Sequence, residues 1–176
     1  HTSDPDFLDQ ATRNKFKKCN MKAVVYDVNG EVVISYLGTE VLSGKDWGAN
    51  FKMGLLDNVT AQMERADELA VIVEEKFPSQ IIKVDGHSEG GSEGIYVGLK
   101  HGWETTTYNA FPVGQGVIND ALQGQDLKDV EHLITNYRDP HDPVSKIRFK
   151  FIGKTYIVEN PDNIPKIRTF YGAINN

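Results

Sequence analysis

The sequence predicts a mixed α/β fold with a mostly parallel central sheet, flanking helices and antiparallel edge hairpins. Short β-branched runs alternate with helical patterns, and glycine-rich turns separate them. Strands that alternate with helices are typical of a parallel sheet. The 176 residues, 39% hydrophobic and 25% charged, fit one globular domain. We therefore expect an N-terminal arm over residues 1–20 and one α/β domain over residues 21–176.

The N-terminal third predicts an arm and a hairpin. Residues 1–19 are polar with few apolar positions, which indicates an arm or one short helix. Apolar runs at 23–26 and 32–37 flank an Asn-Gly pair, which accepts the positive φ angles of a tight turn, so these runs predict a β-hairpin. The polar, glycine-rich stretch 38–56 follows, and loops of that length inside a compact domain are often functional.

The middle of the chain predicts a helix, a strand and a second helix. Asn58 is expected to cap a helix whose apolar residues recur every three or four positions over 59–77. Pro78 ends that helix because its ring clashes with the preceding turn. A β-branched strand at 80–84 then leads through a sharp turn into a helix over 88–100.

The C-terminal third predicts strands that end in polar loops. Runs at 105–108 and 132–137 indicate strands, and the second leads into an Asp- and Pro-rich loop at 138–143. The runs 147–151 and 155–158 flank a Gly-Lys pair and predict an antiparallel hairpin at the edge of the sheet.

Charge and composition exclude several classes of protein. The net charge is −6 and no long basic block is present, which argues against a nucleic-acid partner. No apolar run approaches the ~20 residues of a membrane-spanning helix. The single cysteine, Cys19, cannot form an internal disulfide, and no phosphate-binding or dinucleotide-binding fingerprint is present, so we expect no cofactor. Asp139, His141 and Asp142 form a cluster without a fourth partner, which indicates a solvated turn and no metal site.

Residues 86–90 read Gly-His-Ser-Glu-Gly, a GxSxG motif that Gly91 extends. In a nucleophile elbow, a serine occupies a strained turn between a strand and a helix, and small residues on either side let the chain pass. The following helix directs its N-terminal amides at the site, where they can stabilise an oxyanion. The alternative is that Ser88 is an ordinary helix cap. A strand before the motif and a helix after it favour the nucleophile.

Five segments occur in the order in which one known family carries them. They are the strand end 33–40, the loop residues Asp46, Trp47 and Asn50, the elbow 86–91, the segment Tyr108-Asn109-Ala110 with Pro112, and residues 136–144. On these motifs, the sequence resembles class 3 lipases and the bacterial phospholipase A1-like domains of the α/β-hydrolase superfamily. The resemblance covers about residues 23–158 and implies an α/β-hydrolase-like fold.

The resemblance implies a serine hydrolase site. Ser88 would attack an ester carbonyl, and the amides of Thr39 and Glu89 would form the oxyanion hole. Asp142 would orient a histidine base, with Asp139 as the second candidate, although Asp-Pro pairs are also common turn starters.

Further candidates surround these residues. Gly86, His87, Gly90 and Gly91 would shape the elbow, and Asp46 is a weaker candidate in the long loop.

Two residues depart from the family pattern at the oxyanion hole. Leu37 stands where the family usually has an arginine, and Glu89 stands where it usually has a leucine after the nucleophile. A backbone amide can donate a hydrogen bond whatever side chain its residue carries, so an oxyanion hole can still form with Glu89. A carboxylate there opposes a developing negative charge unless it faces solvent or pairs with a cation. Alternatively, Glu89 is an exposed first-turn acid that complements the helix dipole.

The larger departure concerns histidine. Hydrolases of this fold run in the order Ser, Asp, His, but none of the five histidines follows Asp142. His87 flanks the nucleophile, and His141 lies beside its own candidate acid, which is a poor position for a base. We therefore expect the base to come from a C-terminal segment beyond Asn176 or from a partner chain. The competing interpretation is genuine loss of the base, which would leave a nearly inert domain.

The resemblance implies a lipid ester substrate, with phospholipid cleaved by a phospholipase A1 reaction preferred over triglyceride. It favours a secreted or delivered bacterial effector over a cytoplasmic protein, with a protein partner or cognate inhibitor as a further expectation. One alternative is a catalytically incomplete hydrolase fold that serves as a binding or structural module. Another is a small-molecule esterase or acyltransferase.

Overall fold

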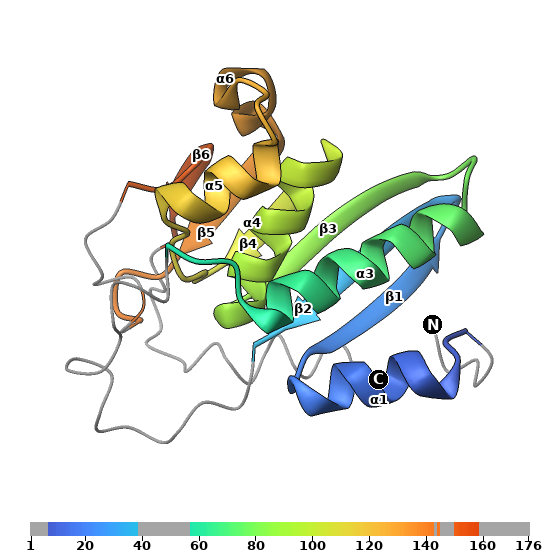
Figure 1. The fold of residues 1–176 in the computed structure, drawn as a ribbon. Coiled ribbons are helices and arrows are strands. Elements are labelled where there is room, and N and C mark those ends of the chain that lie inside the picture. Colours follow the sequence, from blue (N-terminus) through green and yellow to red (C-terminus); the bar gives the residue numbers. More distant parts are fainter. Residues whose placement is uncertain (1–6, 39–56, 143, 145–149, 159–176) are drawn as a thin grey trace.

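A computed structural model describes residues 7–38, 57–142, 144 and 150–158. Its centre is one six-stranded sheet in which the strands lie side by side in chain order, from β1 to β6 (Figure 1). β1 pairs antiparallel with β2, and every later neighbour pairs in parallel. The predicted fold class is confirmed. The strands are β1 (Lys22–Val28), β2 (Glu31–Leu37), β3 (Ile81–His87), β4 (Thr105–Tyr108), β5 (Ile134–Arg138) and β6 (Lys154–Ile157).

Helices fill the connections between these strands. The predicted hairpin, the long helix after it and the helix after the glycine-rich turn are all confirmed. The short helices between β4 and β5 are not predicted by the sequence pattern. The helices are α1 (Gln10–Lys18), α3 (Ala61–Lys76), α4 (Glu89–His101), α5 (Gln115–Leu122), α6 (Leu127–Val130) and the 3-10 turn η1 (Glu131–Leu133).

The hairpin forms because its turn residues tolerate left-handed backbone. Asn29 has φ 55° and Gly30 has φ 87°, so both central positions of the turn lie in the region that this dipeptide accepts. Val28 then faces Glu31 directly, and the two strands pair along their full length.

The cap of α3 lies two residues later than the sequence predicts. Thr60, not Asn58, is the N-cap, and its hydroxyl accepts a hydrogen bond from the Met63 amide at 3.2 Å. The prediction is wrong because either residue type can cap a helix, and the observed start is set by the hydroxyl that reaches the third amide of the helix.

The C-terminal strand is confirmed, but its pairing differs from the predicted hairpin. β6 pairs in parallel with β5, placing Tyr156 beside Tyr137. Asn136 on β5 donates to the carbonyls of Ile152 and Lys154 at 2.7 and 3.2 Å, which fixes the incoming chain against this edge of the sheet. Residues 147–149, in the other predicted strand of that hairpin, lie outside the described residues. β5 also begins later than expected, at Ile134, because the residues before it form η1.

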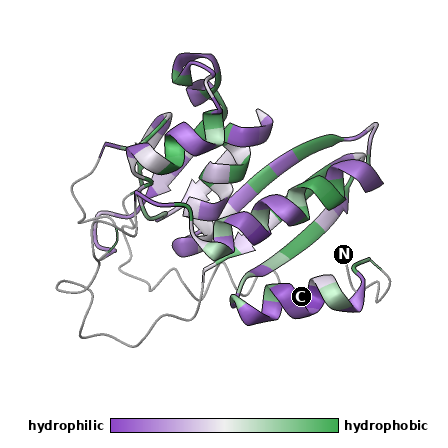
Figure 2. Ribbon diagram, in the orientation of Figure 1, coloured by the Kyte–Doolittle hydropathy of each residue, from purple (hydrophilic) through white to green (hydrophobic). Residues whose placement is uncertain are grey.

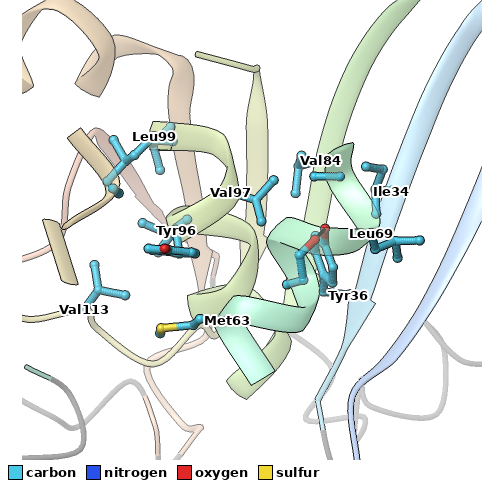
Figure 3. Packing of buried hydrophobic residues seen from close by; sticks show 14 of the residues in the cluster. Ile34, Tyr36, Met63, Leu69, Val84, Tyr96, Val97, Leu99 and Val113 are labelled. Carbon is cyan, nitrogen blue, oxygen red and sulfur yellow. Dashed lines mark hydrogen bonds between the residues drawn. The ribbon is translucent and has the colours of Figure 1, made fainter. Parts of the chain in front are cut away.

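The core lies between the sheet and the helices α3, α4 and α5 (Figure 3). Alternate residues of the central strands face it, as Ile34 and Tyr36 do on β2 and Val84 does on β3. Apolar and polar residues alternate along β3, and polar residues recur along α3 (Figure 2). α1 joins this core through Phe16, which is 7% exposed.

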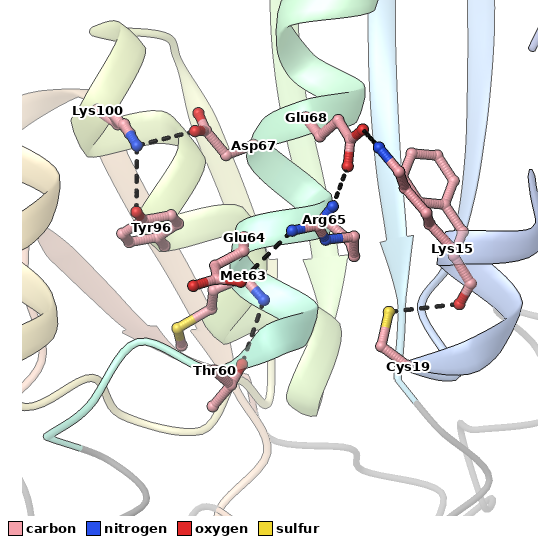
Figure 4. A network of polar contacts seen from close by, with 11 residues as sticks. Lys15, Cys19, Thr60, Met63, Glu64, Arg65, Asp67, Glu68, Tyr96 and Lys100 are labelled. Carbon is pink, nitrogen blue, oxygen red and sulfur yellow. Dashed lines mark hydrogen bonds and ion pairs between the residues drawn. The ribbon is translucent and has the colours of Figure 1, made fainter. Parts of the chain in front are cut away.

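Polar contacts tie the helices together away from the apolar core (Figure 4). Lys100 on α4 lies 2.8 Å from the Asp67 carboxylate on α3 and donates to the Tyr96 hydroxyl at 3.2 Å. Lys15 on α1 bonds Glu68 on α3 at 2.8 Å. Among the helices of the described ranges, none combines the length and apolar composition that crossing a membrane requires.

Candidate active site

Ser88 occupies the turn between β3 and α4, as the motif predicts. Its backbone has φ 57° and ψ −122°, a left-handed conformation that non-glycine residues rarely adopt. Within the described turn and helix, its side chain makes no capping hydrogen bond. The alternative interpretation of Ser88 as an ordinary cap therefore lacks the contact that defines a cap.

Glycines on both sides of Ser88 allow this turn to pack against β2. A Cβ atom on Gly86 would lie 2.7 Å from the carbonyl carbon of Gly90. A Cβ atom on Gly90 would lie 2.6 Å from the carbonyl carbon of Tyr36 on β2. Gly91 meets the Ala110 side chain in the same way. Real Cβ atoms are never found so close to backbone, so these positions require glycine for steric reasons.

The end of β2 reaches the elbow at Gly38. A Cβ atom on this residue would lie 3.1 Å from the Ser88 Cβ and 3.6 Å from the Glu89 amide nitrogen. The absence of a side chain therefore keeps space open beside the first amide of α4. Thr39 and Asp46, two candidate residues from the sequence, lie outside the described residues.

Backbone hydrogen bonds fix the elbow to the neighbouring strand. The Ser88 amide donates to the Tyr108 carbonyl at 3.1 Å. The Ser88 carbonyl accepts from the amides of Gly91 and Phe111, each at 3.1 Å. The chain that leaves β4 therefore lies directly against the first turn of α4.

Asp142 is held by two donors in the loop after β5. One carboxylate oxygen accepts from the Val144 amide at 2.8 Å, and the other accepts from the side-chain amide of Asn109 at 3.3 Å. Arg138 supports the same loop, since its guanidinium donates to the Val144 carbonyl at 3.1 Å. Arg138 is buried and lies over the Phe151 ring at 3.7 Å.

Asp142 acts electrostatically on His87, the residue that precedes Ser88. Burial lowers the pKa of the His87 imidazole, and the charge of Asp142 partly offsets that shift. Asp142 is therefore near enough to act electrostatically on the residue that precedes Ser88. The structure thus brings the candidate nucleophile and the candidate acid to the same end of the sheet, the carboxyl end of its parallel strands, where ligands bind in open α/β sheets.

Asp139 and His141 form a separate pair that faces solvent. The Asp139 carboxylate accepts from the His141 amide at 2.8 Å, and the His141 Nδ1 lies 3.2 Å from the same oxygen. The His141 side chain is 72% exposed. The geometry of this pair is that of a turn, and the Asp142 carboxylate has different partners, the Val144 amide and the Asn109 side chain.

The first turns of α4 carry two acidic side chains. Glu89 is half-buried at the start of the helix. Glu93 is only 2% exposed, and within the described part of the chain its Oε2 has no hydrogen-bond partner. Burial, with a smaller contribution from the Glu89 charge, raises the pKa of Glu93 to about 8. The sequence pattern does not predict that Glu93 is buried, because this burial arises only when α4 packs on β2.

The remaining histidines of the described chain lie in structural or exposed positions. His101 ends α4, where its Nε2 lies 2.8 Å from Asp67 and its ring stacks on Trp103 at 4.5 Å. His132 is exposed in η1. Among the described residues, no three histidine, cysteine or acidic side chains are grouped as metal ligands.

A family model matches residues 4–161 and describes a Tle-like phospholipase domain. The chain belongs to this family. The sequence-based resemblance to lipases and phospholipases is thereby confirmed. No curated protein matches the chain.

A solved structure is also similar to this phospholipase-like domain. It is that of a triacylglycerol lipase from Penicillium expansum, with 16% sequence identity and a TM-score of 0.45. The match covers 86% of the present chain and 66% of the fungal chain.

Two residues of the site are not singled out by sequence reasoning. Asn109 appears there only as part of a family motif, although it follows a predicted strand, a position where functional side chains often lie. Gly38 appears only within the strand-end segment, and the steric need for it becomes visible once β2 and the elbow are adjacent.

Proposed function

We propose that this domain is a phospholipase of the A1 type that uses Ser88 as its nucleophile. The observation that carries the proposal is the backbone of Ser88: a positive φ angle at a strand-to-helix turn, with glycines where side chains would clash with backbone. Such a turn costs conformational energy, and strained turns of this kind cluster at catalytic sites.

The reaction would follow the acyl-transfer scheme of serine hydrolases. Ser88 Oγ attacks the ester carbonyl while a histidine accepts its proton, and the resulting oxyanion is bound by the amides of Glu89 and Thr39. The histidine then protonates the departing alcohol, a lysophospholipid. Water attacks the acyl-enzyme by the reverse proton path and releases the fatty acid. Asp142 orients the histidine and stabilises its charged form.

The base is proposed to be a histidine supplied by a further segment or by a partner chain. None of the five histidines follows Asp142. His87 precedes the nucleophile and His101 is engaged with Asp67, which leaves neither suited to the role. His141 is the alternative within this sequence, since Asp139 already contacts its Nδ1.

A phospholipid substrate would suit a secreted or delivered bacterial protein that meets membranes of other cells, with a cognate inhibitor as a protein partner.

The proposal is tested with the full-length protein on vesicles of phosphatidylcholine and phosphatidylglycerol that carry different acyl chains at the two glycerol positions. We expect release of the fatty acid from the first position and a loss of at least about 10³-fold in rate for Ser88→Ala. Ser79→Ala, in an exposed turn before β3, is the matched control and should retain full activity. Release from the second position only, or faster hydrolysis of triacylglycerol emulsions, would exclude the A1 assignment.

A second candidate function is a binding module on an inactive hydrolase fold, which is favoured by the acidic side chain of Glu89 at the first position of α4, where it would oppose a developing oxyanion. In that case the full-length protein would bind the same vesicles without hydrolysis, and Ser88→Ala would bind equally well. A fluorophosphonate that labels wild-type protein but not Ser88→Ala would decide for the enzyme.

A further inference from the structure

Asn109 lies between the elbow and the acid loop. It follows β4 directly, one residue after Tyr108, whose carbonyl accepts from the Ser88 amide. Its own amide donates to the Tyr137 carbonyl on β5 at 2.9 Å. The residue is therefore attached by backbone both to the strand beside Ser88 and to the strand that leads to Asp142.

The side chain of Asn109 uses both ends of its amide on the acid loop. Its Oδ1 accepts from the Asp139 backbone amide at 2.8 Å, and its Nδ2 donates to the Asp142 carboxylate at 3.3 Å. One contact holds the start of the loop and the other holds the candidate acid. An aspartate side chain in the same place could make the first contact but not the second.

The backbone of Asn109 is also unusual. Its φ of 46° lies in the left-handed region, where asparagine, aspartate and glycine are tolerated better than other residues. This conformation directs the chain from β4 across the first turn of α4, where Phe111 donates to the Ser88 carbonyl. The same residue thus shapes the turn and contacts the acid.

Charged groups approach Asp142 from several elements. The charge of Asp142 raises the pKa of His87 on β3 and of Arg138 on β5, although burial lowers both pKa values by more. Asp139 and His141 belong to its own loop. Asn109 contributes the neutral donor from the end of β4 that bonds the carboxylate directly.

We propose that Asn109 is a positioning residue that sets the orientation of the Asp142 carboxylate relative to Ser88. This inference rests on the proposed serine mechanism. In that mechanism the acid must present one oxygen to the histidine, and a neutral amide donor on another oxygen fixes the carboxylate without cancelling its charge. An Asn at this point donates a hydrogen bond to the Asp142 carboxylate, whereas a second carboxylate would repel it.

The test uses two variants of the full-length protein, with phospholipid vesicles as substrate. Asn109→Asp keeps the left-handed backbone and the acceptor for the Asp139 amide but replaces the donor to Asp142 with a like charge. Asn109→Gly keeps the backbone and removes the whole side chain. Asn119→Asp makes the same chemical change on α5, where Asn119 bonds Gln115, and is the control.

We expect Asn109→Asp to lower kcat about tenfold or more with KM little changed, and to move the acidic limb of the pH profile of kcat/KM to higher pH. Asn109→Gly should lower kcat by a similar factor without moving that limb. Asn119→Asp should match wild type. If Asn109→Asp does not fold, as judged by its urea unfolding curve, Asn109→Gly decides: a lower kcat at unchanged KM and unchanged urea midpoint supports the positioning role, and an unchanged kcat overturns it.

A merely structural role predicts a different result, because Asn109→Asp retains the contact to Asp139. An unchanged kcat and pH profile in the folded variants would overturn the positioning role while leaving the hydrolase intact. An inactive wild-type protein would instead overturn the proposed function, and the positioning role with it. The wild-type rate measured beside Ser88→Ala separates these two failures.

Discussion

The two ends of helix α4 are held in place by different kinds of contact. At its C-terminus, Gly102 adopts φ 68° and its amide bonds the Gly98 carbonyl, an ordinary left-handed cap, while Lys100 and His101 contact Asp67. At its N-terminus, Ser88 takes a left-handed backbone without being glycine and leaves its hydroxyl out of any capping bond to the described helix.

The difference shows what each end contributes. Side chains hold the C-terminal end, and a Cβ atom on Gly102 would meet nothing within 4 Å. Backbone holds the N-terminal end, where glycines touch main-chain atoms of β2 and of the helix itself. Side chains can rotate away from a substitution, but backbone atoms in a sheet cannot. The elbow is therefore intolerant of side chains at its glycines, as the proposed positioning of the Ser88 hydroxyl requires.

The largest contrast is expected between Gly90→Ala and Gly102→Ala. The methyl group at residue 90 would lie 2.8 Å from the Leu37 carbonyl carbon and force β2 away from α4, at a cost of about 3 kcal/mol or more in the free energy of unfolding. Gly102→Ala only places a side chain at a positive φ, for about 1 kcal/mol. Urea unfolding measures both. Equal losses would show that the elbow is no more constrained than the cap.

Glu93, near the elbow end of α4, is expected to make the free energy of unfolding depend on pH. Burial, assisted by Glu89, raises its pKa from 4.5 to about 8, so the folded state binds a proton that the unfolded state has released. The stabilising neutral form is fully present below pH 4.5, and the free energy of unfolding falls by about 1.4 kcal/mol per pH unit as pH rises toward 8. Glu93→Gln should remove this slope.

The control for that experiment is Glu75→Gln, an exposed position on α3, which should leave the pH dependence of unfolding unchanged. A wild-type protein that is equally stable at pH 5 and pH 8 would contradict the account of Glu93.

A smaller effect is expected at the other end of α4 from Asp67→Asn. Burial alone would raise the pKa of Asp67, but hydrogen bonds from His101 and Lys100 outweigh it and lower the pKa below 3.8. The ionised carboxylate therefore stabilises the fold above pH 3.8 and loses this contribution as the pH falls. We expect Asp67→Asn to cost about 1 kcal/mol at pH 7 with kcat unchanged, as unfolding curves and vesicle assays would show. A lower kcat in Asp67→Asn would show that contacts at the C-terminal end of α4 affect catalysis at its N-terminal end.

Most of the fold follows from local patterns in the sequence. The Asn-Gly pair marks the first hairpin, the apolar spacing over 59–77 marks α3, and the β-branched run before the GxSxG motif marks β3. The pairing of β6 does not follow. Strand and turn residues predict a hairpin there, but side-chain hydrogen bonds from Asn136, distant in the sequence, fix β6 parallel to β5.

The candidate site likewise contains some features that the sequence predicts and others that it does not. The motif residues around Ser88 are visible in the sequence because steric demands act over a few neighbouring positions. The surroundings of Asp139 and Asp142 are not, because both residues lie in the same loop and only the partners of their carboxylates differ. The Asp139 carboxylate contacts His141, whereas the Asp142 carboxylate accepts from the Asn109 side chain, 33 positions away along the chain.

The sequence alone determines the class of fold, the family and the place of the GxSxG turn that carries Ser88, since each depends on short-range periodicity or on a contiguous motif. Tertiary structure decides that Asn109 bonds the Asp142 carboxylate, and that Glu93 is buried with its Oε2 lacking a hydrogen-bond partner among the described residues. These properties arise where β2, β4 and β5 meet α4, and distances between separate segments become fixed only when the sheet and helix pack together.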